Sequence, residues 1–232
     1  MLNCNLTSVT TGHSAPAACY CEPITTEDIL AVIQKEQPSG VVTQFAGLHA
    51  NDLTMELSQA GVSIIGTPNQ TVELLQNRYA SYEHMRRIGI PQPAGALVTS
   101  DDALVDAAQA IGFPILVQPA TRTSKTRPRI VRDKHTLTAL SQNRQIDTDE
   151  HLFVEQFLEF GIEAQAETLC DGTRARVAAV MEHVELAGVH AGDSACVLPP
   201  YSISPRHIDT INEYCRKIAV SLHIQGLANF RF

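Results

Sequence analysis

The chain has 232 residues and a net charge of −8, and it carries only 17 Lys and Arg. Its length allows one large domain or two small ones, and the acidic balance argues against a nucleic-acid-binding surface, which needs a clustered basic face. Six Cys fall at scattered spacings without a zinc or redox motif, so we expect reduced thiols.

Residues 1–22 are nearly uncharged and contain the run Ala17-Ala18-Cys19, which is similar to a lipoprotein cleavage site. They have no basic start, and polar residues and Pro16 interrupt the apolar positions, so the segment fits no membrane anchor. No later segment approaches the roughly 20 apolar residues of a spanning helix. We therefore expect a soluble, cytoplasmic protein.

The first 66 residues alternate helix and strand signals. Thr-Thr-Glu-Asp at 25–28 marks a helix start, and Pro-Ser-Gly at 38–40 ends that helix. The elements predicted next are two short apolar strands and the helix between them, over 41–45, 62–65 and 53–60. Because strands that alternate with helices form parallel sheets, residues 1–66 are predicted to be an incomplete doubly wound domain. Its open sheet edge needs a partner.

The order of elements changes in the rest of the chain. The expected helices have apolar residues at helical spacing and cover 72–88, 101–112, 136–140 and 205–222. The expected strands cover 94–98, 114–117, 129–132, 152–155, 163–170, 174–183 and 227–232. Asp101 and Asp102 are predicted to cap the second of these helices. The order is typical of an α+β unit in which antiparallel hairpins enclose a space between two small sheets.

The run EHVELAGVHAGDSACVLPPYSIS at 182–204 combines acids, two His, small residues and a Pro-Pro pair. Its apolar residues are interrupted too often for an amphipathic helix or a buried strand. The run therefore predicts a long, ordered loop, and such loops usually serve a functional site.

This loop closely resembles the corresponding loop of the large subunit of carbamoyl phosphate synthetase, in the ATP-grasp domain of its carboxy-terminal half. Other segments that carry the resemblance are MLNCN at 1–5, YCEP at 20–23, IIGT at 64–67 and LANFRF at 227–232. The resemblance implies an α/β fold followed by an α+β fold. Its implied parts are a partial pre-ATP-grasp (Rossmann-like) domain over 1–66, a helical connector over 67–90, and ATP-grasp subdomains over 91–154 and 155–232. Compared with the family, we expect the chain to be truncated at both ends, which leaves the second subdomain incomplete.

The resemblance also implies a function and a set of nucleotide contacts. In the family this region binds ATP with Mg²⁺ and phosphorylates carbamate to carbamoyl phosphate, which feeds pyrimidine and arginine biosynthesis. The positions that match family contacts are Arg78 for phosphate, Glu155 and Leu158 at the hinge that meets adenine, Glu163 for ribose, Gly188, Val189 and His190 in the closing loop, and Asn229.

Three positions depart from the family pattern. Gln118 stands where the family has an Arg, and a neutral amide cannot replace a guanidinium on a phosphoryl group in flight. Ser124-Lys125 replaces the paired glycines of a phosphate-binding loop. Arg231 replaces a Gln that helps hold the metal, and a cation repels Mg²⁺. We therefore expect impaired catalysis, and we assign no catalytic or metal-binding residue.

Several local interpretations stay open. Glu155 and Glu163 either contact the nucleotide or are charged residues solvated at a strand end. The basic loop of Arg122, Lys125, Arg127 and Arg129 is either a substitute phosphate clamp, with Lys125 as its nucleotide contact, or a solvated hairpin tip. His190 either contacts the nucleotide or makes a structural hydrogen bond within its loop. A wider set, Glu182, His183, Glu185 and His190, has spacings that match no compact metal-ligand motif.

Two functions of different classes also stay open, beside a third possibility of a truncated gene product without independent function. The first is an ATP-dependent ligase portion that supports phosphoryl transfer to carbamate. The second is an inactive ATP-grasp pseudoenzyme that serves as an interaction or regulatory module. Both imply ATP as the ligand, and both allow a partner, either other synthetase domains or a second copy of the chain. Neither involves nucleic acid or a membrane.

Overall fold

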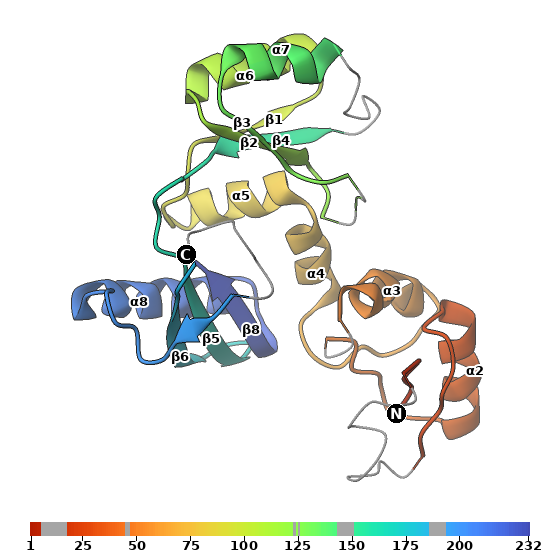
Figure 1. The fold of residues 1–232 in the computed structure, drawn as a ribbon. Coiled ribbons are helices and arrows are strands. Elements are labelled where there is room, and N and C mark those ends of the chain that lie inside the picture. The colour runs from red at the N-terminus through yellow and green to blue at the C-terminus, as the bar shows by residue number, and fades with distance from the viewer. Residues whose placement is uncertain (6–17, 45–46, 123, 125, 143–150, 186–193) are drawn as a thin grey trace. The chain divides into compact units, whose positions relative to one another are not determined.

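The computed structural model describes residues 1–5, 18–44, 47–122, 124, 126–142, 151–185 and 194–232 (Figure 1). The chain divides into two compact units, Met1–Val72 and Glu73–Phe232. Among the described residues, no helix combines the length and the apolar character that crossing a membrane requires.

The first unit contains helices α2 (Thr26–Glu36) and α3 (Gly47–Gln59) and the start of α4 (Asn69–Gln76). The predicted start of α2 is confirmed, because Thr25 is its N-cap and its side chain accepts a hydrogen bond from the Asp28 N–H. Helix α3 begins earlier than predicted. Its Leu57 and Thr54 are fully buried, and the Thr54 hydroxyl lies 2.9 Å from that of Thr43.

The two strands predicted in the first unit are wrong as strands. Val41 and Ile64 form a single parallel bridge, with Val41 N–H donating to Ser63 O and Ile65 N–H donating to Val41 O, each at 2.8 Å. The side chains of Val42 and Ile65 stay about half exposed, at 48% and 47%. In the described part of this unit the bridge joins no longer strand, and an isolated pair has little to stabilise a longer ladder. The parallel direction nevertheless agrees with the doubly wound pattern.

The second unit begins with two helices where one was predicted over 72–88. Helix α4 ends at Gln76 and α5 (Arg78–Arg87) starts after Asn77. The Asn77 side chain accepts a hydrogen bond from the Ala80 N–H at 2.9 Å, and its backbone bridges to Thr121. A helix N-cap therefore interrupts the apolar pattern that suggested one helix.

The first sheet has strands β1 (Gly95–Val98), β2 (Ile115–Pro119), β3 (Arg129–Val131) and β4 (Leu152–Gln156), in the antiparallel order β1-β4-β2-β3. Helices α6 (Asp101–Ile111) and α7 (Lys134–Gln142) cover one face of it (Figure 1). Ser100, rather than the two predicted aspartates, is the N-cap of α6, and Asp101 and Asp102 occupy its first turn.

The other face of the first sheet meets α5. The ring of Tyr82 lies 5.3 Å from that of Phe153 on β4, and the Tyr82 hydroxyl accepts from the Gly95 N–H. Further along α5, Met85 and Ile88 pack with Ile218 and other residues of the second sheet's core. Helix α5 therefore contacts both halves of the second unit.

The second sheet has strands β5 (Ala164–Asp171), β6 (Ala175–His183), β7 (Cys196–Val197) and β8 (Gln225–Arg231), in the antiparallel order β7-β6-β5-β8. Helix α8 (Pro205–Ser221) packs on one face through Ile211 and Cys215. Cys170 and Cys215 are buried in this half, whereas the other four Cys are exposed. The predicted hairpins are confirmed, but the two residues of β7 were not predicted because they are too few to show a period.

Candidate functional site

The described site residues predicted from the sequence fall into two places in the second unit. Glu155 lies on the first sheet and Arg78 at the start of α5, whereas Asn229 lies on the second sheet and Glu163 directly precedes strand β5 of that sheet. Leu158 lies between β4 and β5 and is 53% exposed. The remaining predicted residues lie outside the described part of the chain: Lys125, Gly188, Val189 and His190.

The first place is a group that we name the Glu155 cluster: Arg78, Gln118, Arg122 and Glu155. Successive residues of a strand face opposite sides, so Val154 enters the core under α6 while Glu155 faces the α5 side. The side chain of Gln118, on the neighbouring strand β2, donates from Nε2 to Glu155 Oε1 at 2.7 Å. Gln118 is 7% exposed, so this bond satisfies a buried amide and a partly buried carboxylate together.

The two arginines of the cluster are held by backbone carbonyls. Arg78 donates from Nε to Pro119 O at 3.0 Å, and Arg122 donates from Nε to Leu75 O at 2.9 Å. Burial and then the nearby Arg122 lower the pKa of Arg78 to about 10, and Glu155 acts in the opposite direction. Arg122 as a whole residue is exposed. Its guanidinium is nevertheless partly removed from water, and this burial lowers the pKa of Arg122 as well.

Glu155 responds to the same surroundings in the opposite sense. Burial raises the pKa of Glu155, while Arg78, Arg122 and the bond from Gln118 oppose that rise. Removing a carboxylate from water is costly unless cations or donors compensate it, and here the compensation is incomplete. The cluster therefore brings together two cations and one carboxylate in a partly desolvated setting.

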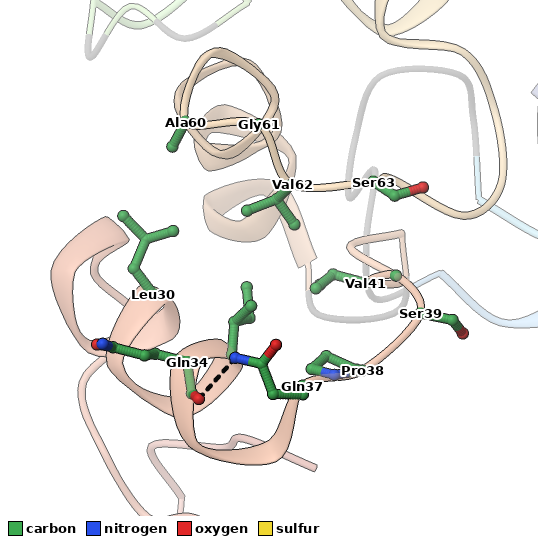
Figure 2. Close-up of a pocket in the computed structure, with 12 residues that line it drawn as sticks. Leu30, Gln34, Gln37, Pro38, Ser39, Val41, Ala60, Gly61, Val62 and Ser63 are labelled. Carbon is green, nitrogen blue, oxygen red and sulfur yellow. Dashed lines mark hydrogen bonds between the residues drawn. The ribbon is translucent and has the colours of Figure 1, made fainter.

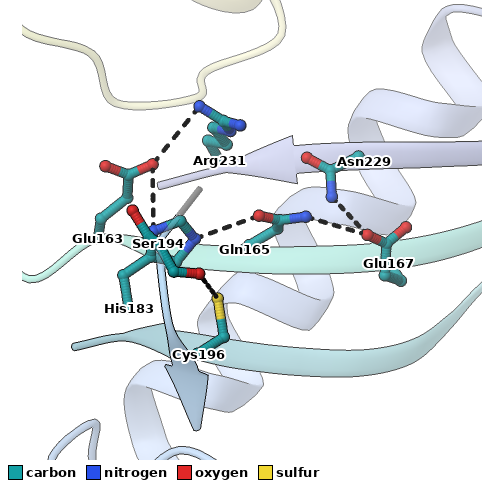
Figure 3. A network of polar contacts seen from close by, with 8 residues as sticks. All are labelled: Glu163, Gln165, Glu167, His183, Ser194, Cys196, Asn229 and Arg231. Atoms are coloured by element: carbon teal, nitrogen blue, oxygen red, sulfur yellow. Dashed lines mark hydrogen bonds and ion pairs between the residues drawn. The ribbon is translucent and has the colours of Figure 1, made fainter. Parts of the chain in front are cut away.

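The second place is a set of polar contacts that we name the Glu163 network. It consists of Glu163, Gln165, Glu167, His183, Asn229 and Arg231, which are drawn in Figure 3. Its main members alternate on one face of the second sheet, opposite α8. Asn229 donates from Nδ2 to Glu167 Oε1 at 2.5 Å, and Gln165 donates from Nε2 to the same oxygen at 3.1 Å. At the other end, Arg231 Nη1 lies 3.7 Å from Glu163 Oε1.

His183 on β6 connects the two ends of the network. Its Nε2 lies 3.1 Å from Gln165 Oε1, and its Nδ1 lies 3.8 Å from Glu163 Oε1. Sequence reasoning missed Gln165 and Glu167 and considered His183 only as a metal ligand. The signal was available, because polar residues at 163, 165 and 167 alternate with Ala164 and Ala166 on a predicted strand.

The described residues do not fit a Mg²⁺ site. Within the described part of the chain, no group of three or more His, Cys, Asp or Glu is arranged to hold a metal ion. Mg²⁺ needs oxygen ligands in octahedral geometry, whereas Glu163 has the Arg231 cation beside it and Glu167 accepts from two amides. We therefore derive no chemical step through a metal.

Glu182, in the loop segment singled out by the sequence, has a structural role. Its Oε2 accepts from the backbone N–H groups of Tyr201, Ser202 and Ile203 at 2.9, 2.7 and 3.3 Å, and the Ser202 hydroxyl donates to Oε1. The bonds from Ser202 are the largest cause that lowers the pKa of Glu182. The carboxylate thus ties the end of β6 to the approach to α8.

A pocket of about 440 Å³ lies in the first unit (Figure 2). Helix α2, the turn after it and the residues that follow α3 supply its walls. In the turn, Gln37 donates from Nε2 to Gln34 O at 2.8 Å. Its described lining residues carry no charge and include none of the predicted site residues, so we place the candidate site on the second unit.

Comparison with protein families identifies both parts of the chain. Residues 1–74 match the carbamoyl phosphate synthase preATP-grasp domain, and residues 77–232 match the carbamoyl-phosphate synthase L chain, ATP binding domain. The whole chain is 42% identical to the carbamoyl phosphate synthase large chain of Methanothermobacter thermautotrophicus and 37% identical to that of Archaeoglobus fulgidus. It spans 22% of the length of each.

Solved structures of other enzymes share the fold. The biotin carboxylase domain of Hydrogenobacter thermophilus 2-oxoglutarate carboxylase, determined with MgADP, ADP and bicarbonate, gives a TM-score of 0.74 at 16% identity over 92% of this chain and 50% of that one. D-alanine–D-alanine ligase from Bacillus anthracis gives 0.70 at 14% identity over 92% and 70%. Together with the family matches, these likenesses lead to one conclusion: the chain belongs to the carbamoyl phosphate synthase large-chain family and comprises a pre-ATP-grasp domain followed by an ATP-binding domain of the ATP-grasp fold.

Proposed function

We propose that this chain binds ATP with the Glu155 cluster and the Glu163 network, as the nucleotide-binding part of a carbamoyl phosphate synthase large chain. The observation that carries the proposal is the placement of Glu163. Its carboxylate stands at the end of a polar sheet face, near Arg231 and His183, within the segment matched by the ATP binding domain. A carboxylate is a pure acceptor, which suits the two hydroxyl donors of a ribose.

The family chemistry that would follow is phosphoryl transfer from ATP to carbamate, which yields carbamoyl phosphate for pyrimidine and arginine synthesis. In phosphoryl transfer the protein mainly positions the reactants and neutralises charge. Gln118 brings no charge to the site, and its amide already donates to Glu155. Losing one preorganised charged contact costs on the order of 10²–10³ in rate. We therefore expect slow turnover by this chain alone.

A second candidate is a nucleotide-binding module without catalysis, which acts through a partner. The ion pair of Arg231 with Glu163 favours it, because that cation lies beside a carboxylate on the proposed nucleotide-binding face. The partners that we propose are the remaining domains of a large chain or a second copy. The half-exposed Val42 and Ile65 beside the open parallel bridge of the first unit support this proposal.

Titration calorimetry of the folded chain with ATP, with and without Mg²⁺, tests the proposal. Saturable ATP binding that Glu163→Gln weakens and Glu213→Gln leaves unchanged would support it, since Glu213 is an exposed acid on α8. A folded chain that binds no ATP would overturn it. Phosphate release that depends on Mg²⁺ and carbamate would favour the ligase over the non-catalytic module.

A further inference from the structure

The Glu155 cluster contains two guanidinium groups whose terminal amino groups have no partner among the described residues. A guanidinium has five N–H donors, and in both Arg78 and Arg122 the described part of the chain engages only the Nε–H. Neither forms an ion pair with Glu155 there, although Glu155 is close enough to act on the pKa of each.

The segments that carry these guanidinium groups are also tied to each other. Arg78 donates its backbone N–H to Ala120 O at 2.7 Å, and Arg122 donates its own to Gln76 O at 2.8 Å. The loop after β2 and the start of α5 are thus joined by a pair of reciprocal backbone bonds. Both arginines are held at the backbone and at Nε. Their remaining N–H donors should therefore lose little conformational entropy when a ligand binds.

The charge of the cluster favours an anion. Two guanidinium groups and one carboxylate leave an excess positive charge, and after burial the nearby Arg122 is the next cause that lowers the pKa of Arg78. The carboxylate already accepts from Gln118. Phosphate oxygens are the acceptors that match the planar fork of arginine, and two such forks match a chain of phosphates better than a single one.

We propose that Arg122 acts together with Arg78 as the binding site for the polyphosphate of the nucleotide. The proposal rests on the proposed function and adds a residue to it. It also separates Arg122 from the rest of the basic loop, because Arg122 acts on the pKa of both Arg78 and Glu155, whereas neither Arg127 nor Arg129 does so among the interactions described.

The test compares Arg122→Gln with Arg127→Gln, which removes the same charge five residues further along the loop. Calorimetry measures the affinity of the full chain for ATP, adenosine and pyrophosphate at low and high salt. We expect Arg122→Gln to weaken ATP and pyrophosphate about ten- to a hundredfold at low salt and to leave adenosine unchanged. Arg127→Gln should change each affinity less than about twofold.

Several results would overturn the inference. One is an equal effect of the two variants on ATP, and another is an equal loss of ATP and adenosine in Arg122→Gln. Circular dichroism checks folding, and if Arg122→Gln does not fold, Arg122→Lys replaces it, because it keeps the charge and loses the fork. Its ATP affinity should then fall between those of the wild type and a chain without the site, and an unchanged affinity would contradict the proposal.

The two proposals fail in different ways. If ATP does not bind but pyrophosphate binds in a manner that depends on Arg122, the anion site stands and the proposed function falls. If ATP binds and Arg122→Gln has no effect, the proposed function stands and this inference falls. A wild-type chain that binds neither ATP nor pyrophosphate would refute both.

Discussion

In the Glu155 cluster two arginines act on the pKa of one carboxylate, whereas in the Glu163 network one carboxylate lies beside an arginine and the other accepts from two amides. The first arrangement carries excess positive charge and is anchored to backbone carbonyls. The second is held by contacts between side chains. Excess positive charge favours phosphates, whereas carboxylates and amides favour hydroxyl groups, so the two groups of residues suit different parts of the proposed nucleotide.

The largest effect on the free energy of unfolding is expected from a substitution that creates a cavity in the core behind the Glu155 cluster. Leu104 on α6 is 1% exposed and packs in the same core as Val154, so Leu104→Ala should cost about 2–5 kcal/mol in the free energy of unfolding. Leu169→Ala is the control, because Leu169 on the second sheet is 54% exposed. Urea denaturation measures both. Equal losses of unfolding free energy in the two variants would mean that Leu104 stabilises the fold no more than an exposed leucine does.

A smaller loss of unfolding free energy is expected when a hydrogen-bond donor is removed, and the loss should differ between the Glu155 cluster and the Glu163 network. Gln118→Leu leaves a partly buried Glu155 oxygen without its donor and should cost about 1–3 kcal/mol of unfolding free energy. Asn229→Leu makes the same change in the Glu163 network, where Glu167 keeps Gln165 as a donor. We expect less than about 1 kcal/mol there. The reverse order, read from urea midpoints, would contradict the contrast between the sites.

The pH dependence of stability should also differ between carboxylates. Burial raises the pKa of Glu155 above its ordinary 4.5, so the protonated form is favoured in the folded state. Its contribution is present below pH 4.5 and is lost as the pH rises through the raised pKa. The unfolding free energy of the wild type relative to Glu155→Gln should therefore fall as the pH rises from 4.5. Parallel curves would argue against this account.

Glu182 should show the opposite sign. Its pKa lies below the ordinary 4.5 because Ser202 donates to its carboxylate. The stabilisation is therefore present above pH 4.5 and is lost as the pH falls below it. Relative to Glu182→Gln, the wild type should lose its advantage at acid pH, as measured by denaturation from pH 7 downward. An advantage that grows toward acid pH would refute the anchoring role.

The smallest effect is expected at Arg231. Its ion pair with Glu163 is long, at 3.7 Å, and the Arg231 side chain is 44% exposed. Arg231→Gln should change the free energy of unfolding by less than about 1 kcal/mol. Thermal melts at low and high salt check this, and a large loss would show that the Glu163 network depends on its arginine as strongly as the Glu155 cluster depends on buried bonds.

The sequence predicted the longer strands of the second unit because several signals agree there. Alternating residues predicted the strands around Ala164 and Ala166, and the resemblance to the large subunit is confirmed by the family matches. The errors arose where two local signals compete. Ser100 and Asp101 are both good N-caps, and Asn77 caps a helix inside an apolar pattern.

The candidate site was harder to predict than the fold. Arg78 and Glu155 were chosen by resemblance, but the Nε bond of Arg122 to Leu75 O spans 47 residues and leaves no local trace in the sequence. His183 is similar, since its contact with Gln165 depends on the β5–β6 pairing. Contacts that depend on strand register and on a loop closing back onto a helix come from tertiary structure alone.

The positions of the cysteines allow thiol alkylation to report on the folding of the second unit. Only a thiolate reacts with an alkylating reagent, and burial raises the pKa of Cys215 to about 11 while Cys170 is also buried. The four exposed thiols should therefore be modified quickly, and the last two only when the second sheet separates from α8. The mass of the alkylated chain over time would then show what fraction of molecules has exposed the two buried thiols, and thus how often that sheet opens.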